Sequence, residues 1–208
     1  MTVESTDTES RLREIREGKP KAMAALFDEY RKRLRQFVQM RMDPRLATRL
    51  DASDVVQEVY LDANRQVLTY LREPKVSFYV WLRGLALQRL SNLRRDHVGA
   101  QRRSVQREIF LPLESSNRLA RQLLAQGPSP SHDVLKSELR GRVQHALGQL
   151  RPQDREVIMM VHFEDMSSAE VAQVLGIGRT AATMRYARAL LRLKEILTLA
   201  LSSGESKP

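Results

Sequence analysis

The sequence predicts an all-α protein of two small helical domains joined by an irregular linker, the second domain containing a helix-turn-helix. Nearly every periodic stretch has the helical spacing of apolar residues, and the alternation of half-buried strands is absent. Two prolines and a glycine in residues 127–131 forbid a continuous helix in mid-chain. A glycine turn at 176–178 separates two further helical patterns.

These breaks set the expected domains. The first domain is expected at 18–109, the linker at 110–132 and the second domain at 133–201, with polar, frayed tails at 1–10 and 202–208. A chain of 208 residues, 42% of them hydrophobic, can bury a core in each domain.

Composition excludes several classes of protein. The chain has no cysteine, and its four histidines lack metal-ligand spacing, so we expect no metal and no cofactor. It has no Gly-rich phosphate loop and no paired carboxylates beside a histidine, so we expect no enzyme. Without a long apolar run or a signal peptide, we expect a cytoplasmic protein that does not insert into membranes.

Charge alternates along the chain, whose formal net charge is +10. Residues 83–107 hold seven arginines against one acid, Asp96, and residues 179–194 hold five cations and no acid. Residues 51–73 hold five acids against two arginines. Two separated basic segments indicate two contacts with a polyanion, because cations that neutralise phosphates release condensed counterions.

The acidic segment predicts a helix, capped by Asp51 or Ser53, that buries one apolar face. This core face comprises Val55, Val56, Val59, Tyr60, Ala63, Val67 and Leu71. The opposite face displays Asp54, Gln57, Glu58, Leu61 and Arg65. It is either a solvated face with one stray leucine or a surface that binds a partner.

The next helix, from about Val76, has a core stripe and a polar flank. The stripe comprises Phe78, Leu82, Leu85, Ala86 and Leu93. The flank aligns Trp81, Gln88, Asn92 and Arg95. An aromatic ring with hydrogen-bonding and cationic neighbours suits unstacked bases, whereas a lone tryptophan at a core margin also serves packing alone.

The C-terminal pattern predicts a helix-turn-helix. Ser167 and Glu170 form a capping box, Gly176-Ile177-Gly178 breaks the helix, and a basic helix begins near Arg179. The second helix is expected to pack through Ala182, Tyr186, Ala189, Leu190, Leu193 and Leu197. Its outward residues are Thr180, Ala181, Met184, Arg185, Arg188 and Arg192. The pattern indicates a helix that enters the major groove, or else an ordinary αα-hairpin with a solvated basic side.

These segments resemble the extracytoplasmic-function (ECF) subfamily of bacterial sigma-70 RNA polymerase sigma factors. DASDVVQEVY (51–60) resembles region 2.2 and FYVWLRGLA (78–86) resembles region 2.3. Residues 146–155, 166–177 and 188–193 resemble region 4. The resemblance covers roughly 20–108 and 134–198, in the family's order and spacing.

The resemblance implies a sigma factor that binds core RNA polymerase, directs it to specific promoters and opens the DNA. Region 2.2 implies a contact with the β′ clamp through Asp54, Gln57, Glu58 and Leu61. Regions 2.3 and 2.4 imply a contact with the −10 element through Trp81, Gln88, Asn92, Arg94 and Arg95. Region 4 implies a contact with the −35 element through Arg179, Thr180, Thr183, Met184, Arg185, Arg188 and Arg192. The β flap and an anti-sigma factor complete the expected partners.

The sequence departs from the family at the recognition helix. Gly178 stands where a serine cap is common, and Thr183 where a basic residue is common. Losing that cation favours an unusual promoter sequence. No segment resembles the domain between regions 2 and 4, or the acidic N-terminal extension, of housekeeping sigma factors.

Three other classes stay open at this point. A repressor would also use a helix-turn-helix but would not need the region 2 helices. An enzyme on nucleic acid would need the catalytic groups that are missing. A helical adaptor that only titrates an inhibitor would lose little without its basic faces.

Overall fold

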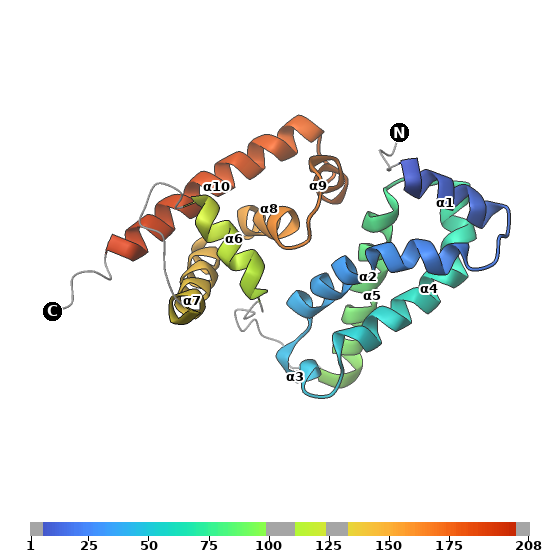
Figure 1. Cartoon of the computed structure of the whole chain (residues 1–208), viewed down its shortest axis with the longest axis horizontal. Coiled ribbons are helices and arrows are strands. Elements are labelled where there is room, and N and C mark those ends of the chain that lie inside the picture. Colours follow the sequence, from blue (N-terminus) through green and yellow to red (C-terminus); the bar gives the residue numbers. More distant parts are fainter. Residues whose placement is uncertain (1–5, 99–110, 124–132, 203–208) are drawn as a thin grey trace. The chain divides into compact units, whose positions relative to one another are not determined.

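The chain folds into two compact helical units. The computed structural model describes residues 6–98, 111–123 and 133–202, and every element in these ranges is a helix (Figure 1). The N-terminal unit is Met1–Glu108 and the C-terminal unit is Ile109–Pro208. The predicted all-α fold is confirmed. No helix of the described ranges is long and apolar enough to cross a membrane.

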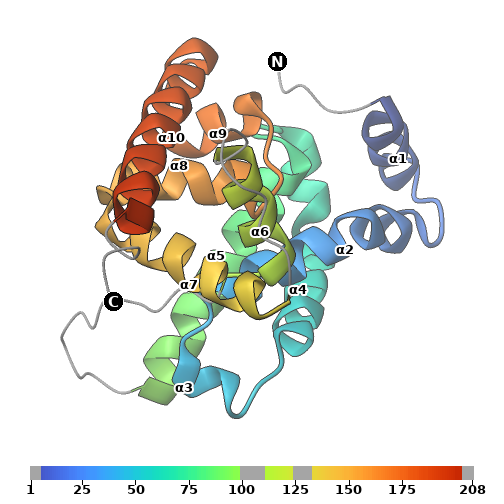
Figure 2. The ribbon, with the colours of Figure 1, turned by 60° about the vertical axis from the view of Figure 1, so that its left-hand side comes forward.

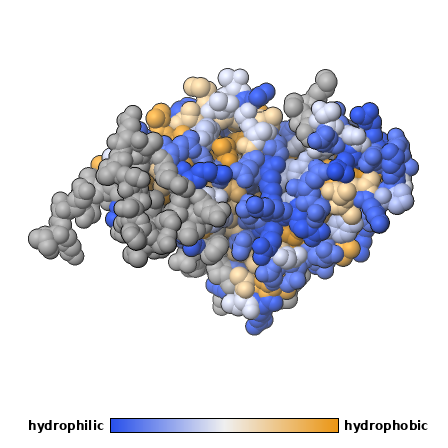
Figure 3. Space-filling view, in the orientation of Figure 1, coloured by the Kyte–Doolittle hydropathy of each residue, from blue (hydrophilic) through white to orange (hydrophobic). Residues whose placement is uncertain are grey.

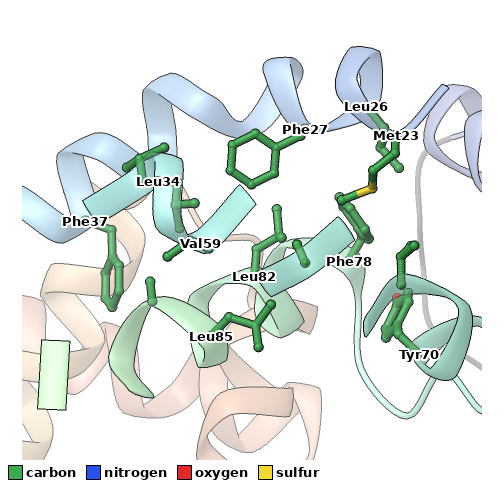
Figure 4. Close-up of a cluster of buried hydrophobic side chains, with 14 of the residues drawn as sticks. Met23, Leu26, Phe27, Leu34, Phe37, Val59, Tyr70, Phe78, Leu82 and Leu85 are labelled. Atoms are coloured by element: carbon green, nitrogen blue, oxygen red, sulfur yellow. The ribbon is translucent and has the colours of Figure 1, made fainter. Parts of the chain in front are cut away.

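The N-terminal unit is built on three long helices that share one core. Its elements are α1 (Thr6–Arg16), α2 (Ala22–Arg41), α3 (Pro44–Ala47), α4 (Ala52–Arg72) and α5 (Phe78–Val98). Phe27 and Phe37 of α2, Val59 of α4, and Leu82 and Leu85 of α5 are buried in this core (Figure 4). The predicted core faces of α4 and α5 are confirmed, with only Tyr60 and Leu93 partly exposed.

The N-terminal tail is more ordered than the sequence suggested. Residues 1–10 were expected to fray, but α1 begins at Thr6 and packs against α2 and α4. Ile15 is buried, Thr8 hydrogen-bonds to Tyr30 at 2.9 Å, and the Arg16 guanidinium donates to the Leu71 carbonyl at 2.8 Å. These anchors act over long sequence distances, which a local pattern does not reveal.

The C-terminal unit packs one long helix against a bundle of shorter ones. Its elements are α6 (Leu113–Leu123), α7 (Asp133–Gln149), α8 (Pro152–His162), α9 (Ser168–Leu175) and α10 (Arg179–Ser202). Helix α10 packs against α7, α8 and α9. Its buried side chains include Ala182, Ala189, Leu193 and Leu197, as predicted, while Tyr186 and Leu190 are half-buried.

The expectation of an irregular segment over 110–132 is wrong for residues 113–123, which form α6. Pro112 precedes the helix, where a missing N–H is tolerated, and its carbonyl accepts the Ser116 hydroxyl at 2.9 Å. Leu119, Ala120 and Leu123 are buried, and α6 packs against α7. The glycine and prolines at 127–131, which predicted the break, lie outside the described residues.

Candidate nucleic-acid and partner interfaces

Helix α4 begins with a capping box that fixes its first turn. The Asp51 carboxylate accepts from the Ser53 amide at 2.7 Å, and the Asp54 carboxylate accepts from the Asp51 amide at 3.0 Å. The hydrogen bonds from Ser53 lower the pKa of Asp51. Asp51 is therefore the cap, and Asp54 is held in place at the start of the outward face while its side chain stays exposed.

The outward face of α4 carries acids and exposed leucines. Gln57 is exposed, and Leu61 is 39% exposed. Glu58 is half-buried and forms an ion pair with Arg89 of α5 at 3.1 Å. Leu68, seven residues after Leu61, is 60% exposed and lies on the same stripe, since seven residues make about two turns. The sequence reading missed Leu68, although this spacing was visible.

Such exposure is uncommon in this chain. On the face that Figure 3 shows, hydrophilic residues dominate and apolar ones form small, separate patches. The large apolar side chains exposed in the described ranges are Leu61, Leu68, Leu87, Met184, Leu191 and Leu199. Two of them share the α4 face, which therefore suits a protein partner with apolar and basic groups.

The flank of α5 presents amides and guanidiniums. Gln88, Arg94 and Arg95 are exposed, and half-buried Asn92 accepts a hydrogen bond from Arg95. The predicted flank is thus largely accessible. Its donors and acceptors suit bases and phosphates of an unpaired strand.

Trp81 is placed differently from the rest of this flank. Its ring stacks on Tyr70, with centroids 4.6 Å apart and planes 18° apart, and it packs against the core. Packing explains its position, because one face of the indole is already covered. A base could meet only the part of the ring that stays open.

The turn between α9 and α10 has the geometry that the sequence predicts. Ser167 and Glu170 cap each other's backbone amides at 3.2 and 2.7 Å, which confirms the capping box. Gly176 ends α9 with φ 62°, a left-handed conformation that favours glycine. The Arg179 guanidinium then donates to the Ser168 hydroxyl at 3.1 Å and ties the two helices together.

The first half of α10 presents a continuous polar and cationic face. Of the predicted DNA-binding residues, Arg179, Thr180, Thr183, Met184 and Arg188 are exposed, as is the outward Ala181, and Arg185 is half-buried. The Thr183 hydroxyl and the Arg188 guanidinium donate to backbone carbonyls of their own helix. Within the described part of the chain, no carboxylate forms an ion pair with Arg179, Arg185 or Arg188. This face suits the phosphates and base edges of a major groove.

Arg192, predicted as part of the same DNA-binding set, has an internal partner. Its guanidinium forms an ion pair with the Asp154 carboxylate of α8. The side chain of Asp154 is only 9% exposed and that of Arg192 44%. Arg192 therefore holds α10 against α8, a role that the sequence reading missed.

A second cluster joins α6 and α8 to α10. The Arg118 guanidinium donates to the His162 carbonyl at 3.0 Å and the Asp165 carboxylate at 3.1 Å. The His162 Nε2 and the Tyr186 hydroxyl share a hydrogen bond of 2.9 Å. Burial, helped by the Arg118 charge, lowers the pKa of His162 to about 4, and burial raises the pKa of Tyr186. The imidazole is therefore neutral at pH 7 and structural. No group of acidic and histidine residues in the described ranges could hold a metal ion.

Comparison with known proteins decides the family. The family model for sigma-70 region 4 matches residues 140–193, which run from α7 into α10. RNA polymerase sigma factor CnrH of Cupriavidus metallidurans is 30% identical over 152 residues, which cover 71% of this chain and 73% of CnrH. The chain belongs to the ECF subfamily of sigma-70 RNA polymerase sigma factors. It is thus a sigma factor of transcription initiation.

Other relatives of this sigma factor agree. The ECF RNA polymerase sigma-E factor of Haemophilus influenzae is 24% identical over 182 residues, covering 86% of this chain and 90% of that protein. The solved structure of CnrH in complex with the cytosolic domain of CnrY has a TM-score of 0.54 at 24% identity and covers 91% of this chain and 96% of that one. This likeness supports the fold.

The region 4 match assigns the helix-turn-helix of this sigma factor but not every candidate residue. It includes the exposed face at the start of α10 and the ion pair between Asp154 and Arg192. Helix α6 lies outside it, as does the whole N-terminal unit. The roles of individual side chains therefore rest on their geometry.

Proposed function

We propose that this sigma factor binds core RNA polymerase, directs it to specific promoters and promotes opening of the DNA. The observation that carries the proposal is the separation of surfaces. An acidic face with two exposed leucines lies on α4, and a cationic face lies on the first half of α10, where Arg179, Arg185 and Arg188 form no ion pair with any described residue. One face suits a protein and the other suits DNA.

The α4 face is the proposed contact with the β′ clamp. Leu61 and Leu68 supply apolar area that a partner would cover, and Asp54, Gln57 and Glu58 provide acceptors in the turns before Leu61. Burying the exposed part of two leucines contributes about 1–3 kcal/mol, while the acids give charge complementarity and orientation. Leu68 thus extends the set of residues predicted from the sequence.

The flank of α5 is the proposed contact with the −10 element. Gln88, Asn92, Arg94 and Arg95 would hold the separated non-template strand by hydrogen bonds and phosphate contacts. Trp81 would contribute only through the part of its ring that Tyr70 leaves open.

The first half of α10 is the proposed contact with the −35 element. Thr183, Met184 and Arg188 would face base edges, and Arg179, Thr180 and Arg185 would hold the helix in the groove. Arg192 contributes through the ion pair that positions α10 rather than as a free phosphate ligand.

Protein contacts of the C-terminal unit are proposed as well. The β flap would bind this unit, where Leu191 and Leu199 of α10 are exposed beyond the DNA-facing half of the helix. CnrH has been solved bound to the cytosolic domain of CnrY. A protein partner of the anti-sigma kind is therefore proposed for this chain too.

The test is transcription by core RNA polymerase from fragmented genomic DNA of the source organism, with and without the purified chain. New transcripts that share upstream sequences 35 and 10 nucleotides before their starts are expected. Core binding without new transcripts would favour an adaptor. DNA binding that blocks transcription without core binding would favour a repressor.

A further inference from the structure

A third basic segment of the chain has no role in the proposed function. Residues 31–49 hold seven cations, Arg31, Lys32, Arg33, Arg35, Arg41, Arg45 and Arg49, against one acid, Asp43. This local excess equals that of residues 83–107. The segment comprises the second half of α2, the short helix α3 and the turn that follows it.

Four of these cations already have partners inside the N-terminal unit. Arg31 pairs with the Asp28 carboxylate, and Arg35 donates to the Ser53 hydroxyl and lies 3.9 Å from Asp51. The remaining two are Arg33, which lies over the Tyr79 ring, and Arg41, which lies over the Phe37 ring. Arg33 and Arg41 pack on rings of the fold, whereas Arg31 and Arg35 are exposed and form surface contacts within the unit.

Arg45 and Arg49 differ from these four and, unlike the seventh cation, exposed Lys32 of α2, they lie in and directly after α3. Both side chains are exposed, and within the described part of the chain neither forms an ion pair. The nearby acid, Asp43, is occupied as the cap of α3, where its carboxylate accepts the Arg45 amide at 3.0 Å. Within the described residues, Asp43 forms no ion pair with a guanidinium.

The α3 turn that carries the two arginines is firmly built. Leu46 is 3% exposed and anchors it to the unit. The Thr48 hydroxyl donates to the Arg45 carbonyl at 2.9 Å, and the Arg49 and Leu50 amides both donate to the Leu46 carbonyl at 2.9 Å. Because this backbone is already fixed, binding of a ligand here costs less conformational entropy.

The α3 turn lies at one end of the unit, beside the end of α5. Helix α3 packs against α5, and Figures 1 and 2 both place it at the C-terminal end of that helix. Exposed Arg94 and Arg95 belong to this end of α5. Exposed guanidiniums of two adjoining elements therefore lie at the same end of the unit as the proposed −10 contact.

We propose that Arg45 and Arg49 bind the phosphate backbone of promoter DNA next to the stretch held by α5. This inference rests on the proposed function. Phosphates fit better than separated, unstacked bases, because residues 43–50 offer cations but no aromatic ring on which such a base could stack and no side-chain amide. The contact adds affinity and positions the DNA without reading its sequence.

The experiment measures promoter binding by the reconstituted holoenzyme over a range of salt concentrations. The test variant is Arg45→Ala with Arg49→Ala. The matched control is Arg13→Ala with Arg72→Ala, which removes the same charge at the opposite end of the unit, where both side chains are exposed. Each lost phosphate contact lowers the slope of log K against log salt by about 0.7–0.9. We expect the test variant to lose about 1.4–1.8 and the control almost nothing.

Three further measurements make the outcome decisive. The test variant should weaken different promoters by equal factors and should keep its affinity for core polymerase. Arg45→Lys with Arg49→Lys should retain most of the slope, because a phosphate accepts either cation. If the double alanine variant melts at a lower temperature than the parent, the two single variants replace it, each expected to lose about 0.7–0.9.

The inference is overturned if test and control variants have the same slope, or if the test variant loses core affinity instead. Failure of the proposed function looks different. In that case the unsubstituted holoenzyme itself would not bind a promoter.

Discussion

Replacing Arg192 and Arg188 of α10 in turn distinguishes an arginine that stabilises the fold from one that is proposed to bind DNA. Arg192→Ala leaves the Asp154 carboxylate, 9% exposed, without its charged partner. A hydrogen bond to a charged group contributes about 1.5–3 kcal/mol, and the half-exposed Arg192 side chain reduces this to about 1–2 kcal/mol. For a unit of this size that corresponds to a fall in Tm of about 5–15 °C. Arg188 forms no ion pair with any residue that the structure describes, so Arg188→Ala should leave Tm nearly unchanged.

The two units can be followed separately in the full chain. The single tryptophan, Trp81, lies in the N-terminal unit, so its fluorescence reports melting of that unit only. Circular dichroism reports both units. Arg192→Ala should lower a transition seen by circular dichroism and leave the fluorescence transition in place.

DNA binding completes the comparison. Arg188→Ala should flatten the preference at one or two promoter positions, since a base contact contributes about 1–3 kcal/mol of discrimination. In stability, the fall in Tm of the double variant Arg192→Ala with Asp154→Ala should be smaller than the sum of the falls of the two single variants. The reasoning fails if Arg192→Ala keeps its Tm and instead lowers the salt slope by about one, the result for a free phosphate ligand.

Three further predictions follow from the other surfaces. Leu61→Ala with Leu68→Ala should weaken holoenzyme formation in a competition assay and lower Tm only a little, because Leu68 is 60% and Leu61 39% exposed. Unaltered core affinity would contradict the α4 assignment. Gln88→Ala with Asn92→Ala should preserve core binding but reduce permanganate reactivity of promoter thymines. Normal opening of the promoter DNA by this variant would show that the two residues do not contact the separated strand. His162 has a folded-state pKa of about 4, below its ordinary 6.5, so the unfolded chain takes up the proton first and stability falls as pH drops from about 6.5 towards 4. Tm measured over this range should depend less on pH in His162→Gln, and an equal dependence would show that other groups cause it.

The helical fold could be predicted because its signals are local. The buried side of α4, the capping box at Ser167 and the turn at Gly176 each follow from spacing within one or two turns. The same reading could have found Leu68, which repeats Leu61 after two turns. The outward face predicted from the sequence included only Leu61.

The wrong predictions have two causes. Turn residues made a longer segment look irregular than they disrupt, and some contacts join residues far apart in the sequence. The prolines and glycine near residue 128 made the whole segment 110–132 look irregular, although the apolar spacing of Leu119, Ala120 and Leu123 fits one face of a helix. The pairing of Arg192 with Asp154 joins residues 38 positions apart and depends on how α8 and α10 pack. No local pattern contains it.

The number of arginines in a basic segment also does not tell how many of them DNA can contact. The basic segment 83–107 begins with Arg83, which is 4% exposed and lies over the Phe37 ring, and continues with Arg89, which is paired with Glu58. Neither is available to DNA as a free cation. The accessible cations of α5 are Arg94 and Arg95.

The chain uses arginine both for packing inside the fold and for the proposed contacts with DNA, and the chemistry of the guanidinium explains why one residue type can do both. The chain has 28 arginines and seven lysines. A guanidinium is planar and weakly hydrated, so it can stack on a ring inside the fold, as Arg33 does on Tyr79 at 3.3 Å, at a desolvation cost that a lysine ammonium would not tolerate. The same fork binds phosphate or guanine when it stays exposed, as at Arg188. The role of each arginine is therefore decided by whether a ring or carboxylate of the fold already covers it, and the positions of the exposed arginines, rather than the net charge of +10, decide where DNA can bind.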